Sequence, residues 1–155
     1  MKDIAIELAR EAGELIVAGR AGDIAVQNTK SSSVDIVTAV DQASEELLFS
    51  RLEALRPDDG FLGEEGRTKE SVSGTTWVVD PIDGTVNFFY NIPHYAVSIA
   101  AVSGNPVPGS WVVEAAVVYN PVTQDMFHAS RGEGAFLGDK RLHITEPPSL
   151  DQALL

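Results

Sequence analysis

The sequence predicts an α+β protein in which two N-terminal helices are layered on a largely antiparallel sheet of about six strands. Up to Pro57, apolar residues recur every three or four positions, which is the spacing of a helix. After Pro57 the apolar runs are short, β-rich and separated by turn residues. Helices followed by strands, without alternation, indicate helices layered on one antiparallel sheet rather than a parallel α/β fold.

Both helices have an apolar stripe. The first is expected at residues 2–20, with the stripe Ile4, Leu8, Ala12, Leu15 and Ile16. The second is expected to begin near Thr38, because Thr38-x-x-Asp41 resembles a capping box with Asp in place of Glu. Its stripe consists of Val40, Leu47, Leu48, Leu52 and Leu55, and Pro57 ends it.

The strands are expected where β-rich runs lie between turn signals. These runs are 60–63, 76–79, 95–102, 111–119, 126–129 and 135–137. Residues 67–74 are polar and predict a loop. Gly138-Asp139 predicts a hairpin turn into residues 141–145.

Composition narrows the possible functions. The 155 residues include 11 basic and 23 acidic side chains, a net charge of −12, and 44% are hydrophobic. The apolar content excludes a disordered acidic tail, and the charge argues against nucleic acid or a membrane as partner. With no cysteine, thiolate chemistry is excluded. The acidic N-terminal segment predicts no signal peptide, and we expect a cytoplasmic protein.

Two acidic turns directly follow apolar strands. They are Glu64-Glu65-Gly66 and Asp80-Pro81-Ile82-Asp83-Gly84-Thr85. Two or three carboxylates and a backbone carbonyl form an all-oxygen ligand set, which suits Mg²⁺. If a short helical turn follows, the Gly84 and Thr85 amides are placed to hold a phosphate, and the Thr85 hydroxyl to orient water. Each motif alone also fits an ordinary surface turn or a helix cap.

Taken together and in order, these segments resemble one family. The matching segments are Asp35-Ile36-Val37-Thr38-Ala39-Val40-Asp41, Gly63-Glu64-Glu65, Trp77-Val78-Val79-Asp80-Pro81-Ile82-Asp83-Gly84-Thr85-Val86-Asn87-Phe88, Ala96-Val97-Ser98-Ile99 and Gly132-x-Gly134-Ala135-Phe136. The chain thereby resembles the inositol monophosphatase family of Mg²⁺-dependent, Li⁺-inhibited phosphatases. The resemblance implies the first half of a layered αβαβα fold and a homodimer when full-length.

The resemblance also implies roles for individual residues. Metal ligands would be Glu64, Asp80, the Ile82 carbonyl and Asp83, for two or three Mg²⁺ ions in the full-length family. The substrate phosphate would contact Asp83, Gly84 and Thr85. Glu64 and Thr85, with Thr85 hydrogen-bonded to Asp41, would activate the attacking water. Glu65 and Lys30 would support the site from its edge.

One departure from the family is large, because members usually carry a second half with a Trp-Asp-x-Ala-Ala/Gly motif. Here Trp77 precedes Val78 and Trp111 precedes Val112. We therefore expect residues 1–146 to form an N-terminal metal- and phosphate-binding domain, and residues 147–155 to start a missing C-terminal domain. The second metal site would lack a carboxylate, so turnover by this chain is expected to be low or absent.

Several functions remain open at the level of the sequence. The leading expectation is hydrolysis of a small phosphate monoester, an inositol monophosphate. Fructose-1,6-bisphosphate, histidinol phosphate and adenosine 3′,5′-bisphosphate are rival substrates within the family. The alternative of another class is a non-catalytic protein-interaction module or a dimerising scaffold of the same fold.

Overall fold

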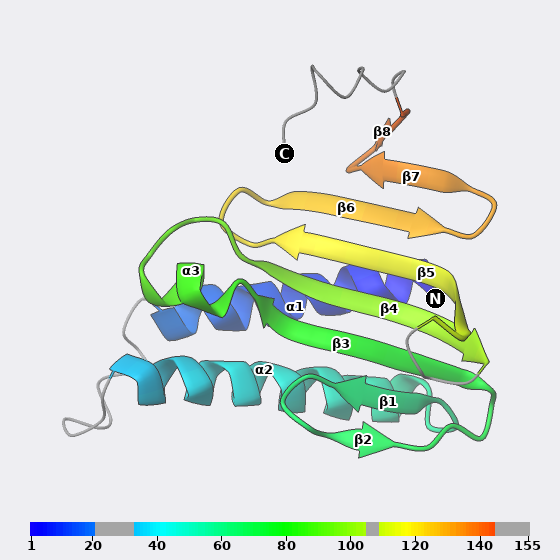
Figure 1. Cartoon of the computed structure of the whole chain (residues 1–155), viewed down its shortest axis with the longest axis horizontal. Helices are drawn as coiled ribbons and strands as arrows, with labels where there is room; N and C mark the ends of the chain where they lie inside the picture. Colours follow the sequence, from blue (N-terminus) through cyan, green and yellow to red (C-terminus); the bar gives the residue numbers. More distant parts are fainter. Residues whose placement is uncertain (21–32, 105–108, 145–155) are drawn as a thin grey trace.

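The computed structural model describes residues 1–20, 33–104 and 109–144, with the side chains described from residue 39 onward in the second helix. Within these ranges an eight-stranded sheet has the order β2-β1-β3-β4-β5-β6-β7-β8. Helices α1 and α2 pack against each other; α1 lies on β4, β5 and β6, and α2 lies on β3 (Figure 1). The α+β class and the layering of helices on a sheet are confirmed.

Helix α1 spans Lys2–Arg20, as expected, and buries Leu8, Ala12 and Ile16. Helix α2 spans Ser33–Leu55 and ends before Pro57, also as expected. The prediction that it begins near Thr38 is wrong, because the helix starts at Ser33. Asp41 therefore lies inside the helix rather than beside its cap. A Thr-x-x-Asp pattern is compatible with the N-terminus of a helix and with its interior, and packing of the buried face decides between the two.

The strands are more numerous than the expected six. The structure has β1 (Gly60–Gly63), β2 (Thr68–Lys69), β3 (Thr75–Asp83), β4 (Ala96–Gly104), β5 (Trp111–Asn120), β6 (Asp125–Ser130), β7 (Gly134–Leu137) and β8 (Lys140–Arg141), with the short helix α3 (Thr85–Phe89) after β3. Both β2 and β8 have two residues. The first lies in the 67–74 segment that was expected to be a loop. It joins the sheet through backbone pairing with β1, which needs no apolar side chains and leaves little signal in the sequence.

Neighbouring strands are antiparallel except for β1 and β3, which run parallel. In that pair Gly63 lies opposite Val79. The carboxyl ends of both strands therefore lie at the same edge of the sheet, where the two acidic turns begin. The β3–β4 register is irregular between Asp80 and Asp83, so the Asp-Pro-Ile-Asp segment bends within the strand.

The core lies between the sheet and the two long helices. Its largest fully buried side chains include Trp77 and Ile99 from the sheet and Leu8 and Leu48 from the helices. This packing fixes the strands whose ends carry the acidic residues. In the described ranges, no helix combines the length and apolar character needed to cross a bilayer.

Candidate active site

The two acidic turns meet because of the parallel β1–β3 pair. Glu64 directly follows Gly63 on β1, and Asp80 follows Val79 on β3. The Glu64 amide N–H donates to the Val79 carbonyl at 3.1 Å, which extends the pairing by one step. The side chains of Glu64 and Asp80 are close enough to share a hydrogen bond. The fold therefore brings together two of the carboxyl groups that the resemblance implies as metal ligands.

Asp80 is a half-buried acid in an unfavourable environment for its charge. Burial, the hydrogen bond with Glu64, and the charges of Glu64, Asp83 and Asp41 together raise its pKa to about 7. Its Oδ1 atom is buried and has no hydrogen-bond partner. A buried acceptor without a partner is uncommon in folded proteins and marks a place where another group is expected to bind.

Asp41 reaches the same region from helix α2. It is 5% exposed, and its Oδ1 atom is likewise buried without a hydrogen-bond partner. Burial is the largest cause that raises the pKa of Asp41 to about 7, followed by the charges of Glu65, Glu64 and Glu45. Helix α2 and the sheet therefore converge on one negatively charged region with two unsatisfied oxygens.

The donor chemistry of this region fits a hard cation, although its carboxylates are not gathered into a finished cage. In the parts of the chain that the structure describes, no group of three or more His, Cys, Asp or Glu residues is arranged to hold an ion. The unpartnered oxygens of Asp41 and Asp80 nevertheless offer the anionic ligands that Mg²⁺ prefers. A bound cation would also offset the burial and the repulsion that together raise both pKa values.

Thr85 makes a different hydrogen bond from the one implied by the resemblance. Its hydroxyl donates to the Ile82 carbonyl at 3.0 Å, not to Asp41. Thr85 is the first residue of α3, and a Thr hydroxyl readily bonds a carbonyl three residues earlier in the chain. The Ile82 carbonyl keeps a second lone pair that is available to a cation.

The turn between β3 and α3 depends on Gly84. This residue has φ 92° and ψ 38°, a left-handed conformation that glycine adopts most easily. A Cβ atom built at Gly84 would lie 3.1 Å from the His94 carbonyl oxygen, tighter than ordinary packing. Asp83 and Thr85 on either side are exposed. The first amides of a helix have no acceptor within it, so the Thr85 N–H can bind an external anion.

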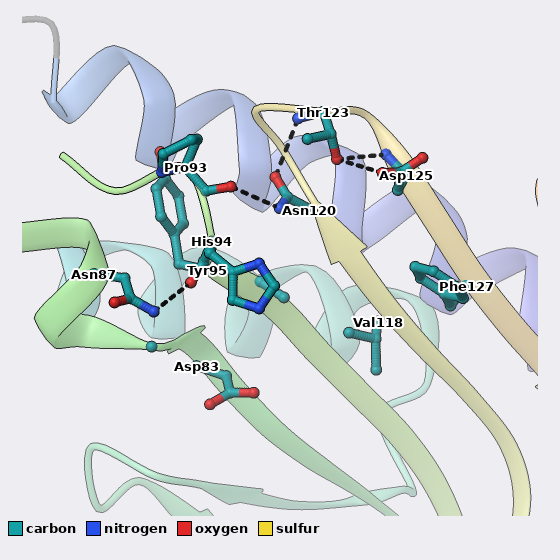
Figure 2. Close-up of a pocket in the computed structure, with 12 residues that line it drawn as sticks. Asp83, Asn87, Pro93, His94, Tyr95, Val118, Asn120, Thr123, Asp125 and Phe127 are labelled. Carbon is teal, nitrogen blue, oxygen red and sulfur yellow. Dashed lines mark hydrogen bonds between the residues drawn. The ribbon is translucent and has the colours of Figure 1, made fainter. Parts of the chain in front are cut away.

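A cavity of about 580 Å³ lies beside this turn (Figure 2). It is lined by Asp83, Gly84, Asn87, Pro93, His94, Tyr95, Ala96, Val118, Asn120, Thr123, Asp125 and Phe127. Its wall at Pro93 and His94 is fastened by two amide side chains: Asn87 donates to the His94 carbonyl at 2.7 Å, and Asn120 donates to the Pro93 carbonyl at 3.2 Å. A small molecule held at Gly84 would have room to extend into this cavity.

The structure thus relates most of the expected site residues to one another. The charges of Glu65 and Glu64 act on Asp41, and those of Glu64, Asp83 and Asp41 act on Asp80. Asp83, Gly84 and Thr85 form the adjoining turn. Lys30 lies outside the described residues.

Sequence reasoning did not single out Glu45 or, apart from Asp83 and Gly84, the residues that line the cavity. A signal for Glu45 existed, because it lies four residues after Asp41 on the face of α2 that also buries Leu48.

The fold and this site define a layered α+β protein with an acidic, oxygen-rich centre beside a glycine turn. The chain belongs to the inositol monophosphatase family, whose model matches residues 1–155. It is 43% identical over 152 residues to an inositol-1-monophosphatase of Caulobacter vibrioides, covering 97% of this chain and 57% of that protein. It is 40% identical over 158 residues to the Nus factor SuhB of Pseudomonas aeruginosa, covering 100% of this chain and 56% of that protein.

The same family appears among solved structures. The crystal structure of the extragenic suppressor protein SuhB from Bartonella henselae superposes with a TM-score of 0.78 at 34% identity, covering 94% of this chain and 54% of that one. This likeness confirms the fold class. The chain spans about half the length of these relatives. Proteins of this family are phosphatases and are generally metal-dependent.

Proposed function

We propose that residues 1–146 form the metal- and phosphate-binding half of a Mg²⁺-dependent hydrolase for inositol monophosphates. The observation that carries the proposal is the pair of buried, unpartnered oxygens on Asp41 and Asp80 beside Glu64. Relatives named as inositol monophosphatases, including the human protein at 36% identity over 157 residues, support this substrate class. The substrate and the metal are parts of the proposal, as are a cytoplasmic location and a homodimer in the full-length form.

The cation would be held by the carboxylates of Glu64, Asp80 and Asp83 and by the Ile82 carbonyl. When bound, Mg²⁺ supplies positive charge that stabilises the phosphate oxygens and makes a water molecule a better nucleophile. Li⁺, a small cation with half this charge, would compete for the same oxygen ligands and is expected to inhibit. Glu65 and Lys30 would support the site without contacting the phosphorus.

The protein's own groups bind the ester and direct the water. The Gly84 and Thr85 amides would donate to the phosphate oxygens, with Asp83 next to them. Glu64 and the Thr85 hydroxyl would orient the water, and Asp41 would accept its proton. The reaction joins the water oxygen to phosphorus, breaks the ester P–O bond, and returns a proton to the departing alcohol oxygen. The products are the alcohol and inorganic phosphate.

The test is phosphate release from inositol 1-phosphate by the 155-residue chain, with Mg²⁺ varied and Asp83→Asn as the control. We expect low or no turnover, because this half offers the ligands of one metal site more completely than those of a second. Mg²⁺ binding that depends on Glu64 and Asp80 would support the proposal even without turnover. Absence of both Mg²⁺ binding and phosphate release would refute it.

A second candidate, a non-catalytic interaction module, is favoured by one observation. The chain matches over its whole length proteins named Nus factor SuhB, at 40% identity in Pseudomonas aeruginosa and 37% in Escherichia coli. The Asp83→Asn variant separates the two functions. A phosphatase would lose activity and metal affinity, whereas an interaction module would keep its partner.

A further inference from the structure

The turn that carries Glu64 is attached to helix α2 as well as to the sheet. Within the turn, the Gly63 N–H donates to the Arg67 carbonyl at 2.9 Å, and the Gly66 N–H donates to the Gly63 carbonyl at 3.3 Å. These bonds close the turn on itself, and the Glu64 N–H donated to the Val79 carbonyl ties its first residue to β3. A contact from another element to the backbone after Glu64 would hold the rest of the turn in place.

Glu45 on α2 provides this contact. Its side chain is buried, at 4% exposure, and both of its oxygens accept backbone hydrogen bonds from the turn. Oε2 accepts the Glu65 N–H at 2.9 Å, and Oε1 accepts the Arg67 N–H at 3.2 Å. Hydrogen bonds to an ionised acceptor are roughly twice as strong as neutral ones, so this two-pronged contact is a firm attachment.

At position 63 this contact leaves no room for a side chain unless Glu45 moves. A Cβ atom built there would collide with the carboxylate of Glu45. Gly63 is also the last residue of β1 and the one that precedes Glu64. The strand end and the helix side chain are therefore packed directly against each other at the point where the acidic turn begins.

Neighbouring residues of α2 hold the outer side of the same turn. The Arg67 guanidinium lies 4.5 Å from the centre of the Phe49 ring and forms an ion pair with Glu46. Glu46 is 54% exposed and contacts the Arg67 side chain, not the backbone of the turn. Of the two adjacent acids, the buried Glu45 thus accepts hydrogen bonds from the backbone of the turn, whereas Glu46 pairs with the Arg67 side chain at the surface.

We propose that Glu45 is a positioning residue that fixes the Glu64 turn and thereby places Glu64 beside Asp80 for cation binding. The inference rests on the proposed function of this site. Glu45 itself would contact neither cation nor substrate. A glutamine of the same length cannot replace it, because the side-chain NH₂ group would face one of the two backbone N–H donors and has no lone pair to accept it.

The experiment compares Glu45→Gln with the matched control Glu46→Gln in the 155-residue chain. Amide hydrogen exchange by NMR reports the attachment of the turn, and titration with Mn²⁺, followed by the EPR signal of the free ion, reports cation affinity. For Glu45→Gln we expect exchange at Glu65 and Arg67 to become about tenfold faster, with Ile99 in β4 unchanged. We expect its Mn²⁺ affinity to fall about 10- to 100-fold, the usual effect of losing a residue that orients a ligand.

The control Glu46→Gln is expected to keep its exchange rates and its Mn²⁺ affinity within about twofold of the parent, because the ion pair that it removes is exposed. Faster exchange in Glu45→Gln together with unchanged Mn²⁺ affinity would reduce Glu45 to a structural clamp and overturn the proposal. Unchanged exchange would overturn it as well. If the parent chain binds no Mn²⁺, the proposed function of the site has failed, and with it the role of Glu45.

A second variant keeps the test valid if Glu45→Gln does not fold. Gly63→Ala keeps the Glu45 side chain itself but displaces its carboxylate from the turn. We expect the same acceleration of exchange at Glu65 and Arg67 and the same loss of Mn²⁺ affinity. A Gly63→Ala chain with the affinity of the parent would contradict the positioning role.

Discussion

The charge of Asp41 on helix α2 acts on Asp80 on strand β3 across the boundary between helix and sheet. The charge of Asp41 is one of the causes that raise the pKa of Asp80 to about 7, after burial and the effects of Glu64 and Asp83. Each residue also has a buried Oδ1 atom without a hydrogen-bond partner. The helix and the sheet are thus held together by apolar packing at a place where their carboxyl groups repel.

Burial of the two acids, together with repulsion from neighbouring carboxyl groups, predicts an unusual dependence of stability on pH in the absence of divalent cations. Asp41 and Asp80 have an ordinary pKa of 3.8 when unfolded and a pKa of about 7 when folded. The folded state therefore binds more protons between these values, so the free energy of unfolding should fall as pH rises from about 4 to about 7 and change little from these groups above that. Urea unfolding with EDTA across this range measures the effect.

The Asp80→Asn variant is the control for that measurement. It removes one of the two titrating groups, so its stability should change less with pH. A parent chain whose stability is flat from pH 4 to pH 7, or an Asp80→Asn chain with the same slope as the parent, would contradict the assignment of these groups.

Mg²⁺ is expected to reverse this loss of stability at neutral pH. An ion that binds the folded state adds about 2.7 kcal/mol to the free energy of unfolding when its concentration is 100 times its dissociation constant. Asp80→Asn should show little of this gain. Asp139→Asn, which changes an exposed acid on the β7–β8 turn, should respond like the parent. An equal response in all three chains would indicate non-specific binding of the ion.

The helices and the longer strands were predictable because their patterns are local. Helix α1 and strand β1 have the expected bounds, and the stripe of apolar residues on α2 was recognised. The start of α2 was missed because Thr38 and Asp41 imitate a cap. Strand β2 was missed because Thr68 and Lys69 contribute backbone pairing and no apolar side chain.

The residues of the candidate site were proposed from the sequence, but their contacts were not. Glu64 and Asp80 were expected just after two apolar strands, and the parallel β1–β3 pair brings the ends of these strands together. The role of Glu45 depends on a long-range contact with the backbone of residues 65 and 67, which no local pattern contains. The Thr85 hydroxyl has a nearby carbonyl as its partner, so a hydrogen bond to Asp41 expected from resemblance did not form in the structure.

Gly84→Ala tests the turn that is proposed to hold phosphate. The substitution places a side chain on a residue with φ 92° and a Cβ atom 3.1 Å from the His94 carbonyl oxygen. The left-handed conformation alone should cost about 1–2 kcal/mol of stability, and the close contact should add to it. Gly132→Ala has the matched strain, with φ 79°, but open space around its Cβ atom.

Two measurements compare the glycine variants: urea unfolding, and binding of inorganic phosphate in the presence of Mg²⁺. Gly84→Ala should be the less stable of the two and should lose phosphate affinity, whereas Gly132→Ala should keep it. Equal phosphate affinity in both variants would argue against a phosphate contact at Gly84.

The contact between Asp59 and Trp77 predicts a dependence of stability on pH that is opposite in sign to that of Asp41 and Asp80 and lies at lower pH. The Asp59 carboxylate accepts the Trp77 indole N–H at 2.9 Å, the Ser73 hydroxyl at 2.6 Å and the Arg56 guanidinium at 2.8 Å. Burial by itself would raise the pKa of Asp59, but the hydrogen bonds from Arg56, Ser73 and Trp77 outweigh it, and the pKa lies below the ordinary 3.8. Its stabilising effect is therefore complete above about pH 4 and is lost as pH falls below that value.

Replacing Asp59 with Asn should lower the free energy of unfolding by about 1–3 kcal/mol at pH 7. The amide has one acceptor oxygen instead of two, so at least one of the three donors, among them the buried Trp77 N–H, would lose its acceptor. The variant should also lack the part of the acid destabilisation that Asp59 causes in the parent. A double-mutant cycle with Trp77→Phe, by urea unfolding at pH 7, isolates the indole contact from the rest. A coupling energy near zero would mean that Asp59 acts through Arg56 and Ser73 instead, and that Trp77 contributes to the core by packing alone.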